Sequence, residues 1–446
     1  MKSPRNISEQ IIVVVLLGIT FFLGFFFYKS SKVSYAEKLF DKNYVHKIEI
    51  ELNEKDGIAQ IENSDQKTKF HANVTIDGER FEDVSFSTRG NASLIDEKIV
   101  ETERFPYKIN FGRFKQGQTY YGLDKLILDN SFRDASFLKN VYSYEIMRRF
   151  NVNAALCSYT EVYLNGELKG LYVVMEEIDK SFLKRNGFLE KTEGLYKPTP
   201  LANNFLKLNQ LKKELLPSEN LSVVLDHSDQ NFDTGGSDLK YRDDQPESYP
   251  AIFENEVIKS SPEARRRVIE AIKSLETGKN IEEYWNFDDL ANFFAVHNFV
   301  VNSDSYTGLT SHNFYLALKD NKISILPWDY DSSLEGAIYP EPINLPIDNP
   351  LQGLSLEDRP LWKQLIGNYY FKEKYHNALQ RLLDEYIYTD EYLYFIDKTA
   401  NLIRPYVQKD PTTTHTLQDF DKTVEDIKTH SSLRADSIQK QLWGLN

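Results

Sequence analysis

The pattern of hydrophobic and polar positions divides the chain into two regions. From Val45 to about Asn130, apolar residues alternate with polar ones or form short β-branched runs, which predicts strands. The Asn165-Gly166 dipeptide separates two further strand patterns and favours the positive φ angles of a tight hairpin turn. The predicted strands are KIEIEL, HANVTID, DVSFSTRG, YKINF, KLILDN, TEVYLNGEL and KGLYVVMEEI.

Helical periodicity appears between and after these strands. Residues 134–150 carry apolar side chains at helical spacing, with Asp134 placed to cap the first turn. Residues 262–276 and 287–303 are also predicted helices, and further helical patterns follow a proline-rich loop at 340–350. The sequence therefore predicts a β-rich part followed by a mainly helical part.

Acidic and amide residues gather around the second part's short apolar runs. Asp304 follows the helix at 287–303, and Asn313 stands at the head of the run HNFYLAL. The run ISIL stops at Pro327, which predicts a short buried strand, and Asp329 and Asp331 follow it. Carboxylates just past strand ends are common metal and phosphate ligands. The same pattern also fits a hairpin whose aspartates face water, because Asp is frequent in turns.

The amino-terminal apolar run predicts a membrane anchor. Residues 11–27 are almost uninterrupted in apolar character, and at helical rise they span roughly 25 Å, close to the hydrocarbon thickness of a bilayer. We expect residues 1–10 in the cytoplasm, a transmembrane signal anchor at 11–28 and a linker at 29–42. The predicted location is the cell membrane, with a single crossing and the large domain outside the cytoplasm.

The amino-acid composition limits the classes of partner that this chain is expected to bind. The formal net charge of −14 argues against a nucleic-acid partner, since binding to the phosphate backbone needs a basic surface. The hydrophobic content of 41% is that of a globular chain, and the single Cys157 excludes an intramolecular disulfide.

A β-rich part before a helical part, with metal-suited acids near their junction, matches what phosphoryl transfer needs. That reaction depends on positioning and charge neutralisation. It uses a lysine on the phosphates, a glutamate that holds the lysine, Mg²⁺, and a carboxylate near the acceptor hydroxyl. The chain contains neither GxGxxG nor the HRD and DFG signatures of common kinases. The residues that could serve are Lys108, Glu145, Asp304, Asn313 and Asp329.

Several sequence motifs occur in the same order as in a known protein family. FSTRGNAS (86–93) looks like the element RGNSS of one family, with Ala92 in place of a serine, and RFPYKINF (104–111) looks like its lysine-bearing strand. From about Val84 to Gly336 the chain resembles the CotH kinase family, which is related to spore coat protein CotH. The other matching motifs are NSFRDASFLKNVYSYEIMRRFNV, VYLNGELKGLYVVMEEID, GLYKP, DLKYRDDQPESYPAIFE, SHNFYL and ILPWDYD.

The resemblance implies an α+β, atypical protein-kinase-like bilobal fold with a β-rich N-lobe and a helical C-lobe. It places a CotH kinase-like domain at residues 43–336, with the N-lobe at about 43–180 and the C-lobe from about 181. Residues 337–446 would then be a helical extension packed on the C-lobe. The implied activity is that of a protein kinase that uses ATP and Mg²⁺.

The resemblance also implies roles for individual residues. Asp304 would be the catalytic carboxylate, and Asp329 would hold Mg²⁺ with Asn313 as the second ligand. Asp331 would replace Asp329 or share its work, because the WDYD motif offers two carboxylates. Lys108 would bind the phosphates and Glu145 would hold Lys108. The remaining nucleotide-binding residues would be Arg89, Gly90, Asn91 and Ser93 over the phosphates, and Glu177 beside the adenine.

The implied acceptor is a serine or threonine of a spore-coat or cell-surface protein. Two alternatives remain at this point. One is a non-catalytic coat or surface assembly protein that keeps the fold, and the other is a metal-dependent phosphohydrolase that uses the same acids.

Overall fold

The amino-terminal strands close into a barrel. The computed structural model describes residues 34–52, 68–89, 104–200, 233–334 and 342–445. Within this part of the chain, seven strands form a closed barrel in the order β1-β2-β3-β4-β5-β7-β6. They are β1 (Val45–Leu52), β2 (Phe70–Ile76), β3 (Glu79–Thr88), β4 (Tyr107–Asn110), β5 (Lys125–Asp129), β6 (Cys157–Leu164) and β7 (Glu167–Glu176).

Neighbouring barrel strands are antiparallel except where the barrel closes. There β1 and β6 run parallel, with Val45 opposite Tyr159. The β6–β7 hairpin turns at Asn165 and Gly166, whose φ angles are 50° and 86°, which confirms the predicted tight turn. Strand β6 is therefore paired on one side with its sequence neighbour and on the other with the first strand of the chain.

The barrel wall has two buried faces. Along β5, Leu126 and Leu128 point into the barrel core, while Ile127 between them belongs to a second, larger core outside the barrel. This follows from the two-residue repeat of a strand. The outer face of β5 and β7, which includes Ile127 and Met175, is therefore covered by other parts of the molecule.

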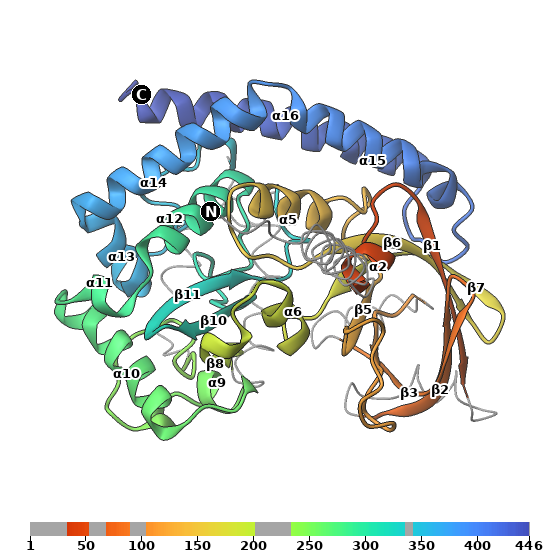
Figure 1. Cartoon of the computed structure of the whole chain (residues 1–446). Coiled ribbons are helices and arrows are strands. Elements are labelled where there is room, and N and C mark those ends of the chain that lie inside the picture. Colours follow the sequence, from red (N-terminus) through yellow and green to blue (C-terminus); the bar gives the residue numbers. More distant parts are fainter. Residues whose placement is uncertain (1–33, 53–67, 90–103, 201–232, 335–341, 446) are drawn as a thin grey trace, which may run out of the picture.

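A four-stranded antiparallel sheet lies beside the barrel, in the order β11-β10-β8-β9 (Figure 1). Phe314 on β10 pairs with Pro327 on β11, and Leu316 pairs with Tyr196 on β8. The residues just before β10 and just after β8 and β11 therefore meet at one end of the sheet. The strands are β8 (Thr192–Tyr196), β9 (Glu256–Ile258), β10 (Phe314–Lys319) and β11 (Lys322–Pro327).

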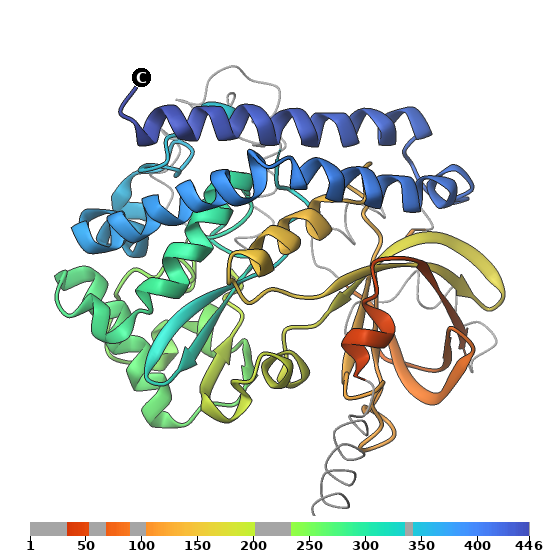
Figure 2. The same ribbon diagram turned by 45° about the horizontal axis from the view of Figure 1, so that its top comes forward.

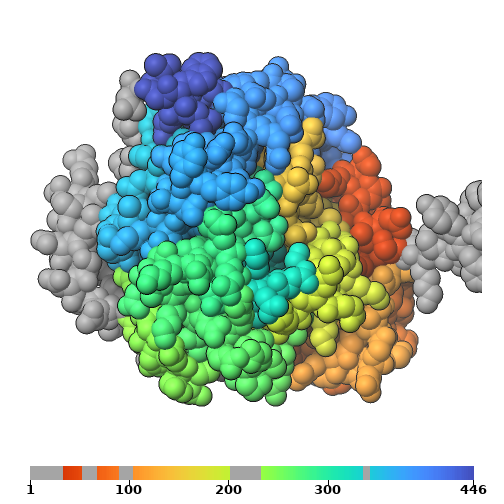
Figure 3. Space-filling model, turned by 60° about the vertical axis from the view of Figure 1, so that its left-hand side comes forward, coloured from red at the N-terminus to blue at the C-terminus, as the bar shows by residue number. Residues whose placement is uncertain are grey.

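Helices pack around the sheet and across the barrel. Figures 1 and 2 show α5 between the barrel and the sheet, and the long α15 and α16 running over both. Figure 3 brings forward the left-hand side of the Figure 1 view, where the green α10–α12 region lies directly against the blue α13–α14 region. The α-helices are α2 (Tyr35–Leu39), α5 (Lys139–Arg149), α6 (Lys180–Arg185), α9 (Pro250–Phe253), α10 (Pro262–Thr277), α11 (Ile281–Tyr284), α12 (Phe287–Val300), α13 (Pro360–Gly367), α14 (Tyr369–Leu382), α15 (Glu391–Gln408) and α16 (Leu417–Leu442).

Short helical turns connect these elements. They are the 3₁₀ turns η1 (Leu189–Lys191), η3 (Pro246–Ser248), η4 (Pro342–Asn344) and η5 (Leu356–Asp358), and the π-helical turn η6 (Leu383–Ile387).

The predicted fold class is wrong. The sequence predicted an α+β, protein-kinase-like bilobal fold with a transmembrane helix, whereas the amino-terminal strands close into a seven-stranded barrel. Closure depends on the parallel contact of β1 with β6, which joins segments more than a hundred residues apart. Local hydrophobic patterning predicts strands but carries no signal for such a contact.

Two local predictions also need correction. The helix predicted at 134–150 begins at Lys139, although Asp134 still accepts a 2.9 Å hydrogen bond from the Lys139 backbone N–H. Residues 35–39, predicted as part of a linker, form α2, in which Tyr35 and Leu39 are buried.

The prediction of a single-pass membrane protein is wrong for the described residues. None of their helices is both long and apolar enough to cross a bilayer. The segment at 11–28, for which the anchor was predicted, lies outside the described residues.

The loop between α15 and α16 reaches back to the barrel. Asp410 forms a buried ion pair with Arg104, with 2.9 Å between Oδ2 and Nη1, and accepts a 2.8 Å hydrogen bond from the Leu171 backbone N–H. Gly170 has φ 106°, and a Cβ there would overlap the Asp410 carboxylate. The carboxy-terminal helices therefore contact the barrel as well as the second sheet.

Candidate active site

The outer face of the barrel wall supplies the first ion pair of the site. Lys108 on β4 lies opposite Ile127 on β5, and Ile127 lies opposite Met175 on β7. Glu177 follows Met175 by two residues and so shares its face. The Lys108 Nζ lies 2.7 Å from Glu177 Oε2. Burial opposes the charge of Glu177, but Lys108, Lys197 and Arg89 outweigh burial and lower the pKa of this carboxyl to about 2.

Glu145 does not hold Lys108. On α5 it forms ion pairs with Lys42 and with Arg148, the latter at 3.0 Å. The structure therefore places Glu177, predicted to lie beside the adenine, in the position predicted for Glu145. Lys42 belongs to the segment that follows α2, and no local pattern in the sequence indicates that this segment lies near α5.

Arg89 stands at the end of β3 and faces the second sheet. Its guanidinium lies 5.0 Å from the centre of the Trp328 indole and 3.8 Å from the Asp129 carboxylate. Burial disfavours the charge, but Asp329, Asp129 and Glu177 outweigh burial and raise the pKa of Arg89. Arg89 thus links the barrel to the WDYD motif. The other predicted residues of its loop, Gly90, Asn91 and Ser93, lie outside the described residues.

Three carboxylates influence one another at this junction. Burial, and next the charge of Asp331, raise the pKa of Asp329. Burial also raises the pKa of Asp129, where Arg89 acts against the shift and Asp331 adds to it. Asp331 itself accepts a 3.0 Å hydrogen bond from the Ser332 hydroxyl. The sequence did not single out Asp129, although its place at the end of a strand was a usable signal.

These acids fit a magnesium ion that is shared with phosphate oxygens. No group of three or more His, Cys, Asp and Glu side chains in the described ranges is arranged to hold a metal alone. Mg²⁺ commonly uses one or two carboxylates and completes its shell with water and phosphate. The charge of Asp331 opposes the ionisation of Asp329, and a cation held by these two carboxylates would compensate it.

Asp304 lies in a tight loop after α12. Its carboxylate accepts hydrogen bonds from the Thr310 hydroxyl at 2.9 Å and from the Asn313 side-chain amide at 3.2 Å. The His312 Nε2 lies 3.6 Å from the same carboxylate. Asn313, predicted as a metal ligand beside Asp329, therefore contacts the predicted catalytic acid.

Asn302 connects the Asp304 loop to the WDYD motif. Its side-chain oxygen accepts a 3.0 Å hydrogen bond from the Asp304 backbone N–H, and its amide donates to the Asp329 carbonyl at 3.3 Å. Asp329 has φ 56°, and its own N–H donates to the Tyr144 hydroxyl at 2.8 Å. Asp304 and Asp329 are thus fixed relative to each other by one buried side chain that sequence analysis missed.

Buried groups hold the Asp304 loop in place. A Cβ on Gly308 would overlap the Ser303 carbonyl, so the loop can close this tightly only around glycine. The Arg359 guanidinium donates to the Tyr306 carbonyl at 2.6 Å and also to Gly308. His297 bonds Thr307 at 2.7 Å and Tyr330 at 2.9 Å, which ties the loop to the WDYD motif.

Lys197 is a further site residue that sequence analysis did not assign, although it stands in the quoted GLYKP motif. It follows β8 and so lies at the end of the sheet where Trp328 leaves β11. Its Nζ is 5.0 Å from the Trp328 ring centre and 5.6 Å from that of Tyr315. Burial, and next the charge of Arg89, lower the pKa of Lys197.

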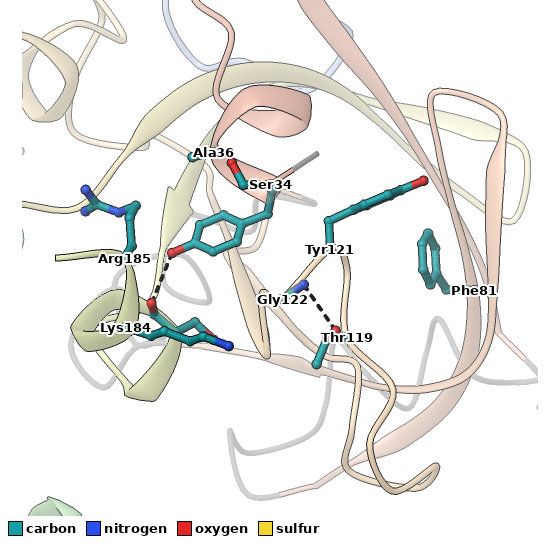
Figure 4. A pocket seen from close by; sticks show the side chains of 10 residues that line it. Ser34, Ala36, Phe81, Thr119, Tyr121, Gly122, Lys184 and Arg185 are labelled. Carbon is teal, nitrogen blue, oxygen red and sulfur yellow. Dashed lines mark hydrogen bonds between the residues drawn. The ribbon is translucent and has the colours of Figure 1, made fainter. Parts of the chain in front are cut away.

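A pocket of about 1040 Å³ lies on the other side of the β7 end, and none of the predicted site residues lines it (Figure 4). Tyr35 from α2 lines this pocket, and its hydroxyl donates a 3.2 Å hydrogen bond to the Ser181 carbonyl. The Tyr35 hydroxyl also bonds Glu176, which Arg185 contacts at 2.7 Å. This region therefore packs α2 against the barrel and is separate from the candidate site.

Comparisons with known proteins agree with the motif pattern. A family described as CotH kinase protein matches residues 86–438. The match continues beyond Gly336 and includes α15 and most of α16. The inner spore coat protein H of Bacillus subtilis (strain 168) is 21% identical over 361 residues, which cover 81% of this chain and 87% of that protein.

Proposed function

The chain belongs to the CotH kinase family, and on that premise we propose that it transfers the γ-phosphoryl group of ATP to serine or threonine hydroxyls of a protein. The observation that carries the proposal is the Lys108–Glu177 ion pair, set beside Arg89, Lys197 and Asp329. A lysine held by a carboxylate next to metal-suited acids is the arrangement that phosphoryl transfer uses.

Lys108 would bind the phosphates of ATP from the barrel side. Glu177 fixes the lysine, because the 2.7 Å ion pair leaves the ammonium few other positions. Arg89 lies on the same side and contributes a second cation. Both groups would stabilise the charge that spreads over the phosphate oxygens during transfer.

Asp304 would orient the acceptor. The hydroxyl oxygen would attack the γ-phosphorus, the bond to the β,γ-bridging oxygen would break, and ADP would leave. Asp304 would accept the hydroxyl proton. Thr310 and Asn313 already donate to its carboxylate, so its position is set before the acceptor arrives.

Asp329 and Asp331 would hold Mg²⁺, with Asn313 as an additional ligand. The ion would neutralise charge on the phosphate oxygens. The chain's own contribution is to keep Asp329 in a left-handed backbone conformation, fixed by Tyr144 and Asn302, so that its carboxylate stays at the junction.

A spore-coat protein is the proposed acceptor. The support is the similarity to a protein whose name places it in the inner spore coat. We accordingly propose the coat as the place of action.

The test uses the purified full-length chain with Mg²⁺, ATP labelled in the γ-phosphate, and solubilised spore-coat protein. We expect label on serine or threonine, located by mass spectrometry, and we expect ATP to raise the melting temperature. Asp304→Asn should abolish transfer while ATP still stabilises the fold. Asp288→Asn, an exposed acid on α12, is the matched control.

Three outcomes would contradict the proposal. Stabilisation by ATP without transfer would indicate a non-catalytic assembly protein. Phosphate release without an acceptor would indicate a phosphohydrolase. Full transfer by Asp304→Asn would remove the catalytic role of this carboxylate.

A further inference from the structure

Two cations share one aromatic side chain at the centre of the candidate site. The Arg89 guanidinium and the Lys197 ammonium each lie 5.0 Å from the centre of the Trp328 indole. They come from different parts of the fold, one from the end of β3 and the other from the end of β8. Cations over an indole face are attracted by its electrons, so Trp328 offsets part of the repulsion between them.

The two cations differ in how their charge is compensated. Arg89 lies 3.8 Å from Asp129, and Lys108 nearby is paired with Glu177. Lys197 forms no ion pair with any carboxylate of the described residues. The charges that act on it are those of Arg89 and Lys108, which oppose its charge, and of Glu177 and Asp329, which favour it. A partly buried ammonium without a paired anion is costly unless an anion is supplied from outside.

Two buried hydrogen-bond donors also indicate that an anion is supplied from outside. The Trp328 Nε1 and the Tyr315 hydroxyl are both buried, and neither has a hydrogen-bond partner in the described part of the chain. The rings of these residues meet edge to face with 5.6 Å between their centres, and Lys197 lies near both. Buried polar groups are normally satisfied, so unsatisfied donors around an unpaired ammonium indicate a missing acceptor.

We propose that Lys197 and Arg89, together with the donors of Trp328 and Tyr315, form an anion subsite that receives a phosphate group of the nucleotide. The identity of the ligand rests on the proposed function, but the need for an anion rests on the geometry alone. Lys197 is then a phosphate-binding residue from the sheet side, opposite Lys108 on the barrel side. A phosphate chain held between them would contact both parts of the fold.

Calorimetric titration of the full-length protein, carried out in the presence of Mg²⁺, tests this proposal. The ligands are ATP, inorganic tripolyphosphate and adenosine, and the variants are Lys197→Met, Lys197→Arg and Lys191→Met. Lys191 is an exposed lysine on η1, just before the same strand, and serves as the matched control. If Lys197→Met does not fold, Lys197→Gln replaces it.

We expect Lys197→Met to bind ATP and tripolyphosphate about 10- to 100-fold more weakly, which is the usual effect of losing one charge-assisted contact. Adenosine binding and the Lys191→Met variant should be unchanged, and Lys197→Arg should recover part of the loss. In transfer assays, Lys197→Met should raise KM for ATP more than it lowers kcat.

The subsite is ruled out if Lys197→Met binds tripolyphosphate as the wild type does, or if the wild type binds no polyphosphate at all. An equal loss of adenosine binding would instead assign Lys197 to the base. Failure of the proposed function looks different, because a wild type that binds ATP through Lys197 yet transfers nothing would keep the subsite and lose the kinase assignment.

Discussion

Glu176 and Glu177 are consecutive, but their carboxylates lie on opposite faces of the barrel wall. Glu176 faces the barrel core and bonds Tyr35 and Arg185, whereas Glu177 faces outward and bonds Lys108. The two-residue repeat of a strand requires this separation. The end of β7 therefore joins the packing of α2 to the candidate site.

The Glu177 carboxylate, and not that of Glu145, is expected to support phosphoryl transfer. Glu177→Gln would release Lys108, and we expect kcat/KM for ATP to fall by about 100-fold or more, because a positioned charge is lost from the phosphates. Glu145→Gln is the matched control and should retain near-normal activity, since Glu145 contacts Lys42 and Arg148 instead. Equal losses in both variants would contradict the assignment.

The free energy of unfolding should depend on pH in the acid range because of the ionisation of Glu177. Its pKa in the folded protein is about 2, below the ordinary value of 4.5. The ionised carboxylate therefore stabilises the fold fully above pH 4.5, and this contribution is lost as the pH falls from 4.5 towards 2. The loss is at most about 3 kcal/mol.

Denaturant unfolding at several pH values measures this effect. The difference in unfolding free energy between the wild type and Glu177→Gln should shrink over that acid window. A difference that stays constant from pH 6 to pH 2 would show that Lys108 does not depress the carboxyl pKa.

The Asp304 loop should not tolerate a side chain at position 308. Gly308→Ala would force the Ser303 carbonyl aside and displace Asp304, so we expect transfer to fall by about 100-fold. KM for ATP should change little, because the role proposed for Asp304 is on the acceptor and not on ATP. Gly367→Ala, where an added Cβ meets nothing within 4 Å, is the control. Normal transfer by Gly308→Ala would mean that the loop can open without loss of function.

The buried Arg104–Asp410 pair should be important for stability. Asp410→Asn leaves a buried guanidinium without its carboxylate, and we expect a loss of about 3 kcal/mol or more in unfolding free energy. Asp426→Asn removes an exposed ion pair with Lys422 and should leave the denaturation midpoint nearly unchanged. Similar midpoints for the two variants would contradict a structural role for the buried pair.

Local elements of this fold could be predicted from the sequence. The strands around KINF and KLILD, the Asn165-Gly166 turn and the strand that stops at Pro327 are present as expected. Their signals are local, since alternation, turn residues and proline each act within a few positions. The same two-residue alternation of a strand requires Glu176 and Glu177 to face opposite ways.

The partners of the site residues could not be predicted in the same way. The sequence predicted Glu145 as the partner of Lys108, whereas the observed partner is Glu177, and this difference depends on how α5 packs on the barrel. Lys197 becomes notable only when the register of β8 with β10 places it beside Trp328. Such relationships arise from tertiary packing, which no local pattern encodes.

The position of Asp410 in the chain bears on how the protein is made. Arg104 pairs with the carboxylate of Asp410, which lies 306 residues later in the chain. During translation every barrel strand emerges from the ribosome well before Asp410, so the nascent barrel forms before this carboxylate can pair with Arg104. Strand β7 therefore gains its contact with the α15–α16 loop only after that loop has been synthesised.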